Sequence, residues 1–229
     1  MKKIVSILMV VLAMTAISGC SKDENKNESE KEWVDLGLPS GLLWAECDLG
    51  ANAPEENGNY YAWGETTPKD IYTWRSYRYC TVDEEGNPVT FTKYNVDSEY
   101  GPVDNLVTLE ESDDAVTVNM GNGARMPTQE EWTELFLNTT HRLDTVNGVY
   151  GHRLTGANGK SIFLAAGGYC SDSMEYRHVG EYGLYWSSSL SEEGVNSARF
   201  AYLTPKAQHY VSRLSRFVGF KIRAVRQTL

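Results

Sequence analysis

The clearest helical pattern in this chain lies in residues 123–136, which read GARMPTQEEWTELF. Three large apolar side chains, Trp132, Leu135 and Phe136, fall on one face of that stretch at helical spacing. An apolar face of this kind needs another element to cover it. Because most of the chain that follows has the pattern of strands, we expect the helix to pack on a sheet.

A capping box marks the start of this helix. Glu131 follows Thr128 after two intervening residues, so the threonine hydroxyl can accept a hydrogen bond from the Glu131 amide while the glutamate carboxylate accepts one from the Thr128 amide. The pair predicts a helix from Gln129 to about Asn138.

A shorter helix is predicted just upstream. Ser112 is suited to an N-cap, and the two aspartates that follow it place negative charge where the helix dipole favours it. We therefore expect this helix to run from Asp113 to about Asn119 and to end at the glycine-rich residues 121–123.

The remaining apolar stretches read as short strands. Asn147-Gly148 stands between two such stretches and is a strong hairpin signal, and Asn158-Gly159 marks a second turn. Further strands are expected at NYYAWGE (59–65), SIFLAA (161–166), GLYWSSSL (183–190), SARFAYL (197–203) and GFKIRAVR (219–226). The last of these alternates apolar residues with charged ones.

An aromatic excursion separates the early strands from the helices. Residues 66–100 are rich in tyrosine, tryptophan and turn residues, with arginines among the rings. Flat rings beside polar donors commonly line sugar and partner surfaces, which makes Trp74 and Tyr77 candidate ligand-binding residues. The same rings could equally well pack inside the domain, and both alternatives stay open. Trp63 and Trp186 lie in strand motifs, where we expect them in the core.

The first 20 residues read as a targeting segment. Two lysines precede an apolar run that is shorter than the roughly 20 residues of a membrane span. The run ends in ISGC, which resembles the lipobox of bacterial lipoproteins. We therefore predict a lipoprotein signal peptide over residues 1–20 and a lipid anchor on Cys20, which would hold the protein to the bacterial outer membrane.

A polar segment follows the targeting segment. Residues 21–32 contain no apolar side chain and predict a flexible acidic tether. Their opening, SKDE, resembles the export signal of surface-exposed lipoproteins of the Bacteroidota type, and an ordinary solvated linker explains the same letters equally well. Residues 33–229 are then one domain. The net charge of −10 argues against nucleic acid as a partner, because phosphate binding needs a basic surface.

Several motifs together carry a family resemblance. They are DLGLPSGLLWAECDLGA, NYYAWGE, ESDDAVTVNMGNGARMPTQEEW, IFLAAGG, YWSSSL and GFKIRAVR. From about Val34 to Val225 the chain resembles the Fibrobacter succinogenes major paralogous domain. That family is similar to formylglycine-generating-enzyme-like domains, whose RLPTEAEWE and GFR motifs are echoed at residues 125–131 and 219–223, and to the C-type lectin fold.

The resemblance implies an α+β, C-type-lectin-like domain with irregular antiparallel sheets and two short helices. It also implies an exported, lipid-anchored protein without an assigned chemistry. We therefore predict a non-enzymatic, cofactor-free module at the cell surface for adhesion to, or binding of, an extracellular glycan or protein.

The alternative is an enzyme of the formylglycine-generating type, which oxidises thiols with copper. In those enzymes two closely spaced cysteines late in the chain hold the metal, because thiolates suit copper(I). Here no cysteine follows Cys170, so Cys80 would have to meet it in the fold. A disulfide among Cys47, Cys80 and Cys170 has three pairings, and the sequence does not choose between them.

A metal site is a weaker candidate. Acidic residues cluster at 104–114, and oxygen ligands of this kind suit Ca²⁺. The cluster consists of Asp104, Glu110, Glu111, Asp113 and Asp114. No calcium-loop spacing is present, so we interpret the two last aspartates as helix caps and predict no metal. The histidines, at positions 141, 152, 178 and 209, show no metal-ligand spacing, and we expect them to be structural or exposed.

Replacing Cys20 tests the predicted anchor. Cys20→Ala removes the thiol that acylation needs, so we expect metabolic labelling with an alkyne fatty acid to be lost. Cys47→Ala is the control and should keep the label. Unchanged labelling of Cys20→Ala would contradict the lipoprotein assignment.

Overall fold

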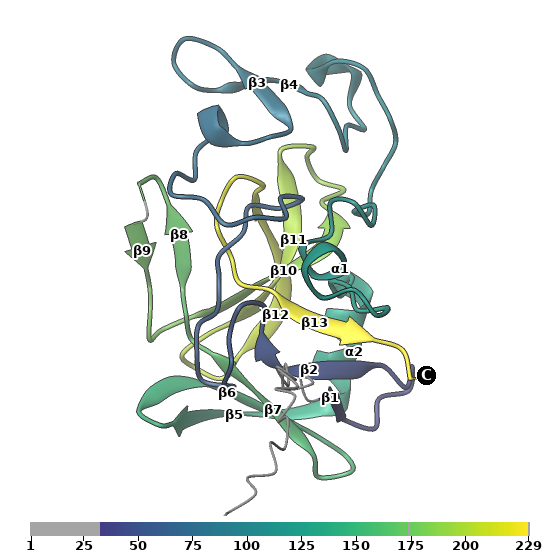
Figure 1. Ribbon diagram of the computed structural model, residues 1–229, viewed down its shortest axis with the longest axis vertical. Helices are drawn as coiled ribbons and strands as arrows, with labels where there is room; N and C mark the ends of the chain where they lie inside the picture. The colour runs from purple at the N-terminus through teal and green to yellow at the C-terminus, as the bar shows by residue number, and fades with distance from the viewer. Residues whose placement is uncertain (1–32, 174, 229) are drawn as a thin grey trace, which may run out of the picture. The chain divides into compact units, whose positions relative to one another are not determined.

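Short antiparallel strands are the main regular elements of the structure, with two short α-helices beside them (Figure 1). The computed structural model describes residues 33–173 and 175–228. The predicted signal peptide with Cys20 and the predicted tether therefore lie outside the described residues. Among the residues that are described, no helix combines the length and apolar character needed to cross a membrane.

The strands, in chain order, are β1 (Trp33–Asp35), β2 (Leu43–Asp48), β3 (Cys80–Val82), β4 (Pro88–Phe91), β5 (Thr139–Val146), β6 (Val149–Gly156), β7 (Ser161–Ala165), β8 (Tyr169–Ser171), β9 (Glu175–Arg177), β10 (Gly183–Leu190), β11 (Ser197–Leu203), β12 (His209–Ser215) and β13 (Arg223–Arg226). The helices are the 3-10 turns η1 (Trp74–Ser76) and η2 (Ser98–Tyr100) and the α-helices α1 (Ala115–Met120) and α2 (Gln129–Asn138).

Three small sheets and two hairpins organise these strands. The sheets have the orders β1-β2-β13, β5-β6-β7 and β10-β11-β12, and the hairpins are β3-β4 and β8-β9. The turn at Asn147-Gly148 joins β5 to β6, which confirms the predicted hairpin. Because β13 pairs with β2, the last strand of the chain lies beside one of the first (Figure 1).

Helix α2 forms as predicted. Its capping box is present, with Thr128 Oγ1 accepting from the Glu131 amide at 3.3 Å and the Thr128 amide donating to Glu131 Oε2 at 2.8 Å. The helix buries Trp132, Leu135 and Phe136, and its partner surface includes β10, β11 and β12. Burial of the amphipathic face therefore positions the helix on a sheet.

Helix α1 begins later than predicted. Asp114, not Ser112, is the N-cap, and its side chain accepts from the backbone amides of Val116 and Thr117. The helix runs from Ala115 to Met120. The predicted cap at Ser112 was wrong because the Asp114 carboxylate accepts from these amides, whereas the interpretation of Asp114 as a helix cap is confirmed.

One strand prediction was wrong, and a second was wrong in part. NYYAWGE does not form a strand, and only Tyr61 makes an isolated bridge, with Phe220. In the closing stretch, β13 covers Arg223–Arg226 only. The charged side chains of this stretch do not point to solvent, because Lys221 and Arg223 are both fully buried.

Those two cations surround a buried carboxylate. Asp48 lies 2.6 Å from Arg223 Nη2 and 3.3 Å from Lys221 Nζ. Arg223 also donates to the Ala45 and Phe163 carbonyls at 3.0 and 2.9 Å. Backbone carbonyls and one carboxylate thus supply the partners that buried cations need.

Removal of the Trp132 side chain tests the packing of α2. Trp132 is fully buried and lies 4.7 Å from the ring of Trp44, so Trp132→Ala should lower the free energy of unfolding by about 3–5 kcal/mol. Thr128→Ala should cost about 1 kcal/mol through the lost cap. Leu137→Ala, at a position 79% exposed, is the control and should be near neutral in urea denaturation. A near-neutral Trp132→Ala would contradict the packing.

Candidate functional site

The aromatic excursion wraps around a buried arginine. Arg216 is fully buried, and its Nε donates to the Tyr77 hydroxyl at 2.9 Å. Four ring centroids lie 4.8–5.9 Å from its guanidinium carbon, those of Trp63, Tyr77, Phe91 and Tyr94. Cation–π attraction is strengthened in such a desolvated setting, so this cluster holds the excursion to the domain.

This packing corrects one of the sequence-based assignments. Tyr77 does not present its ring to a ligand, because it is 3% exposed and its hydroxyl donates to the Trp63 carbonyl at 2.8 Å. Trp74 is half-buried, with its ring centroid 4.9 Å from that of Phe217. A ligand-binding role for Trp74 stays a prediction.

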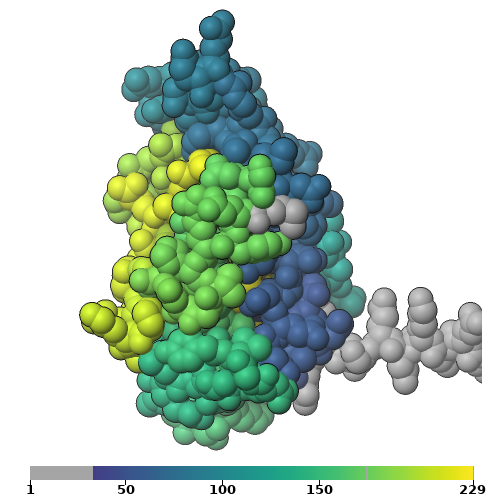
Figure 2. Space-filling view, turned by 90° about the vertical axis from the view of Figure 1, so that its left-hand side faces the viewer, coloured from purple at the N-terminus to yellow at the C-terminus, as the bar shows by residue number. Residues whose placement is uncertain are grey.

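A cavity of about 540 Å³ lies near the excursion, where residues 57–60 and 68–72 face the β8–β9 hairpin. Figure 2 shows the green surface around β8 and β9 next to the blue surface of the earlier segments. Cys170, Tyr176 and Val179 contribute the hairpin side of the wall. The volume falls within the roughly 300–1,000 Å³ of typical ligand pockets, which makes this cavity the candidate site. A hollow of about 490 Å³ over α2 is lined by that helix alone and is part of its outer surface.

Close backbone packing positions the loop at residues 57–60. The Asn59 amide donates to the Leu49 carbonyl at 3.0 Å. Gly58 has a φ of +58°, and a Cβ there would lie 2.6 Å from the same carbonyl oxygen. At Gly50 a Cβ would lie 2.4 Å from Asn59 Nδ2. Gly58 therefore leaves no room for a side chain, and the φ of +89° at Gly50 favours glycine there, so the loop packs directly on the backbone of Leu49.

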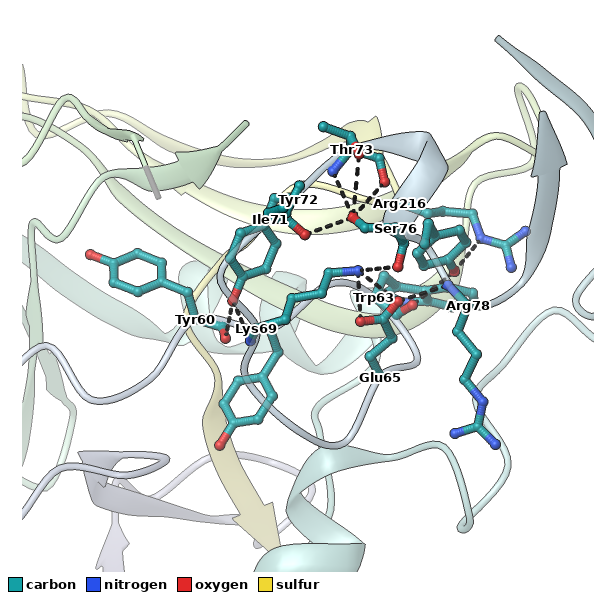
Figure 3. Close-up of polar contacts among 12 residues, drawn as sticks. Tyr60, Trp63, Glu65, Lys69, Ile71, Tyr72, Thr73, Ser76, Arg78 and Arg216 are labelled. Atoms are coloured by element: carbon teal, nitrogen blue, oxygen red, sulfur yellow. Dashed lines mark hydrogen bonds and ion pairs between the residues drawn. The ribbon is translucent and has the colours of Figure 1, made fainter. Parts of the chain in front are cut away.

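Tyrosines form the aromatic wall of the cavity. The Tyr60 hydroxyl donates to the Gly167 carbonyl at 2.5 Å. The Tyr72 hydroxyl donates to the Tyr60 carbonyl at 2.7 Å (Figure 3). Burial raises the pKa of both hydroxyls, so both stay protonated and keep these bonds. Tyr176 lies with its ring centroid 5.2 Å from that of Tyr60 and is 50% exposed, so its ring remains accessible.

A lysine between the cavity and the arginine cluster is neutralised internally. Lys69 Nζ lies 2.8 Å from the Glu65 carboxylate and donates to the Ser76 carbonyl at 3.0 Å (Figure 3). The same ammonium lies 5.6 and 5.7 Å from the ring centroids of Tyr72 and Tyr77. Its charge is therefore already paired within the domain.

The cysteines do not meet as a pair. Cys80 and Cys170 are both free thiols, so none of the three disulfide pairings forms. Cys170 lines the cavity, and burial, followed by the nearby Asp172 charge, raises the pKa of its thiol to about 11. Burial likewise raises the pKa of Cys80 to about 11. Both thiols are protonated at neutral pH, whereas metal binding and nucleophilic attack need thiolate.

The acidic cluster serves internal contacts. Asp113 accepts hydrogen bonds from the hydroxyls of Tyr79 and Tyr94, each at 2.6 Å, and pairs with Lys93. Burial alone would raise the pKa of Asp113, but these hydrogen bonds outweigh it and lower the pKa. Asp104 accepts from backbone amides in its own loop. Across the described ranges, no three histidine, cysteine or acidic side chains are placed to share a metal ion.

Three histidines meet in a chain that the sequence analysis missed. His141 Nδ1 lies 2.9 Å from His209 Nδ1, and His141 Nε2 lies 2.9 Å from His152 Nδ1. His141 thus uses both ring nitrogens toward different partners, so the three rings do not converge on one point. His152 is fully buried, and its Nε2 has no hydrogen-bond partner among the described atoms.

The approach of His141 to His152 could have been predicted from the register of the β5–β6 hairpin. The two-residue turn at Asn147-Gly148 pairs His141 with Leu154, which places His152 on the adjacent diagonal of the same face. His209 arrives on β12, from a different sheet, and no spacing in the sequence signals that approach.

No protein-family profile matches the chain, and no curated protein or solved structure shows significant similarity to it. The family resemblance described above therefore remains a prediction.

The histidine cluster predicts acid sensitivity of the fold. Burial lowers the pKa of His141 to about 4 and of His152 to about 3, and it lowers the pKa of His209. The folded pKa values lie below the ordinary 6.5, so the stabilisation is complete above about pH 6.5 and is lost as the pH falls toward 4. Each histidine contributes at most about 1.4 kcal/mol per pH unit.

Urea denaturation between pH 7 and pH 5 measures this effect. The midpoint should fall with acidification, and His152→Leu should flatten the dependence. His178→Gln is the control, because His178 is exposed and pairs with Glu181. A wild-type midpoint that stays constant over this interval would rule out the buried neutral cluster.

Proposed function

We propose that the protein is a lipid-anchored cell-envelope module of the bacterial outer membrane that binds an extracellular glycan or protein without catalysing a reaction. The observation that carries the proposal is the tyrosine-walled cavity, which has the backbone-bonded loop at residues 57–60 on one side and the exposed ring of Tyr176 on the other. Ligand sites typically combine an aromatic surface with a few positioned polar groups in this way. The cavity replaces Tyr77 as the recognition site.

The C-type-lectin-like fold and the location at the cell envelope are part of the same proposal. The antiparallel sheets and two short helices are consistent with the C-type-lectin-like architecture that the family motifs imply. The lipobox-like ISGC supports export and anchoring at Cys20. Together they support the proposal of a binding cavity on a domain that is tethered at the envelope.

The competing function is copper-dependent thiol oxidation. One observation favours considering it, because the free thiol of Cys170 lines the cavity. The raised pKa values of Cys170 and Cys80 weigh against it, since copper(I) binds thiolate. We therefore rank binding above oxidation.

Paired tyrosine variants test the binding function. Tyr176→Ala should lower the affinity for the retained glycan or protein by roughly tenfold, because it removes the accessible ring, and the melting temperature should change little. Tyr210→Ala is matched in chemistry and exposure, at 47%, lies on β12 and should leave binding unchanged. Glycan arrays and arrays of purified secreted proteins supply the ligands.

An oxygen-consumption assay with a thiol peptide and copper tests the alternative. Oxidation that is lost in Cys170→Ser would reverse the ranking of the two functions. Equal binding by Tyr176→Ala and the wild type would remove the cavity from the recognition site.

A further inference from the structure

We propose that the cavity accepts a neutral saccharide unit, with Asp70, Asn57 and Asn59 binding its hydroxyls and Tyr176 stacking on its apolar face. This inference rests on the proposed function and names the class of ligand. It depends on the charges, free polar atoms and exposed ring that the cavity wall presents.

The charges of the wall select against anions. Asp70 lines the cavity, and among the described residues no side chain pairs with its carboxylate. The lysine that lines the wall, Lys69, is paired with Glu65 at 2.8 Å. Lys221 lies behind the wall and is held by Asp48 at 3.3 Å and by the Ala165 carbonyl at 2.8 Å. A phosphate, sulfate or uronate would therefore meet an unpaired negative charge, and the described residues of the wall offer no free cation to receive it.

The free polar atoms suit hydroxyl groups. Asn57 Oδ1 accepts from Lys221 Nζ at 3.4 Å, which leaves the Asn57 amide hydrogens as donors. Asn59 Nδ2 donates to the Tyr61 hydroxyl at 3.4 Å, which leaves the side-chain oxygen of Asn59 as an acceptor. Together with the Asp70 carboxylate, the wall offers both donors and acceptors. A sugar hydroxyl needs both, because it donates and accepts at once.

An aromatic platform completes the site. Tyr176 is half-exposed and its ring is supported by Tyr60, while Val179 adds a 51% exposed apolar side chain beside it. The C–H face of a pyranose packs on a ring of this kind, whereas its hydroxyls point to polar groups around the edge. The Asn59 amide is already bonded to the Leu49 carbonyl at 3.0 Å, so part of the loop that carries the two asparagines is ordered before binding.

The test uses the full chain with its anchor, in detergent, on an array that holds neutral, sulfated and uronate-containing glycans. We expect retention of neutral glycans. Titration with the free neutral saccharide should show roughly tenfold weaker binding for Asp70→Asn, because charge-assisted hydrogen bonds are about twice as strong as neutral ones. Tyr176→Ala should weaken binding by a similar factor, and Tyr210→Ala should bind as the wild type does.

Three results would overturn the inference, and they separate it from the proposed function. Retention of acidic glycans alone, with tighter binding by Asp70→Asn and weaker binding by Tyr176→Ala, refutes the neutral class and keeps the cavity. Retention of no glycan refutes the saccharide, while a protein ligand sensitive to Tyr176→Ala would keep the binding function. Wild-type affinity in both cavity variants refutes the inference and the proposed site together.

Discussion

The fold around the cavity depends on how one buried cation is satisfied. Arg216 follows β12 directly and is fully buried. Its guanidinium donates to the Tyr77 hydroxyl and to the carbonyls of Lys93, Tyr94 and Val195, at 2.9–3.2 Å. A buried charge is costly unless every donor is matched, and here neutral oxygens and four aromatic faces supply the match. The excursion at residues 66–100, which has little regular structure, is thereby tied to the sheet that carries α2.

A second buried cluster connects the two ends of the domain. Asp48 on β2 pairs with Arg223 on β13 and with Lys221 just before it. Burial lowers the pKa of Lys221 to about 8, although the Asp48 charge opposes that shift, so the ammonium depends on its carboxylate partner. Lys221 Nζ also reaches Asn57, which stands on the cavity wall. The same ion pairs that hold the last strand to an early one thus support the loop that we propose as part of the binding site.

Hydrogen bonds around the cavity hold its wall in place and leave some groups free for a ligand. The hydroxyls of Tyr60 and Tyr72 are already bonded to backbone carbonyls, and the asparagine loop is bonded to the Leu49 carbonyl. The groups that remain without internal partners are those that could face a ligand. This division explains why Tyr77 and Tyr176 have different roles although both are tyrosines that contact other aromatic rings. Tyr77 uses its hydroxyl and ring inside the domain, whereas Tyr176 keeps half of its surface in solvent.

The sequence alone determined the local elements whose signals lie within a few residues. The Thr128–Glu131 box and the Asn147-Gly148 turn placed α2 and the β5–β6 hairpin correctly, because capping and turn formation depend on neighbouring backbone groups. Tertiary structure alone decided which aromatic rings are buried, why the charged positions of the last strand are internal and how His209 reaches the other two histidines. Those outcomes depend on partners tens of residues away in the sequence. Composition and local spacing do not predict such contacts. The candidate site belongs to this second class, since its wall is assembled from three segments that only the fold brings together.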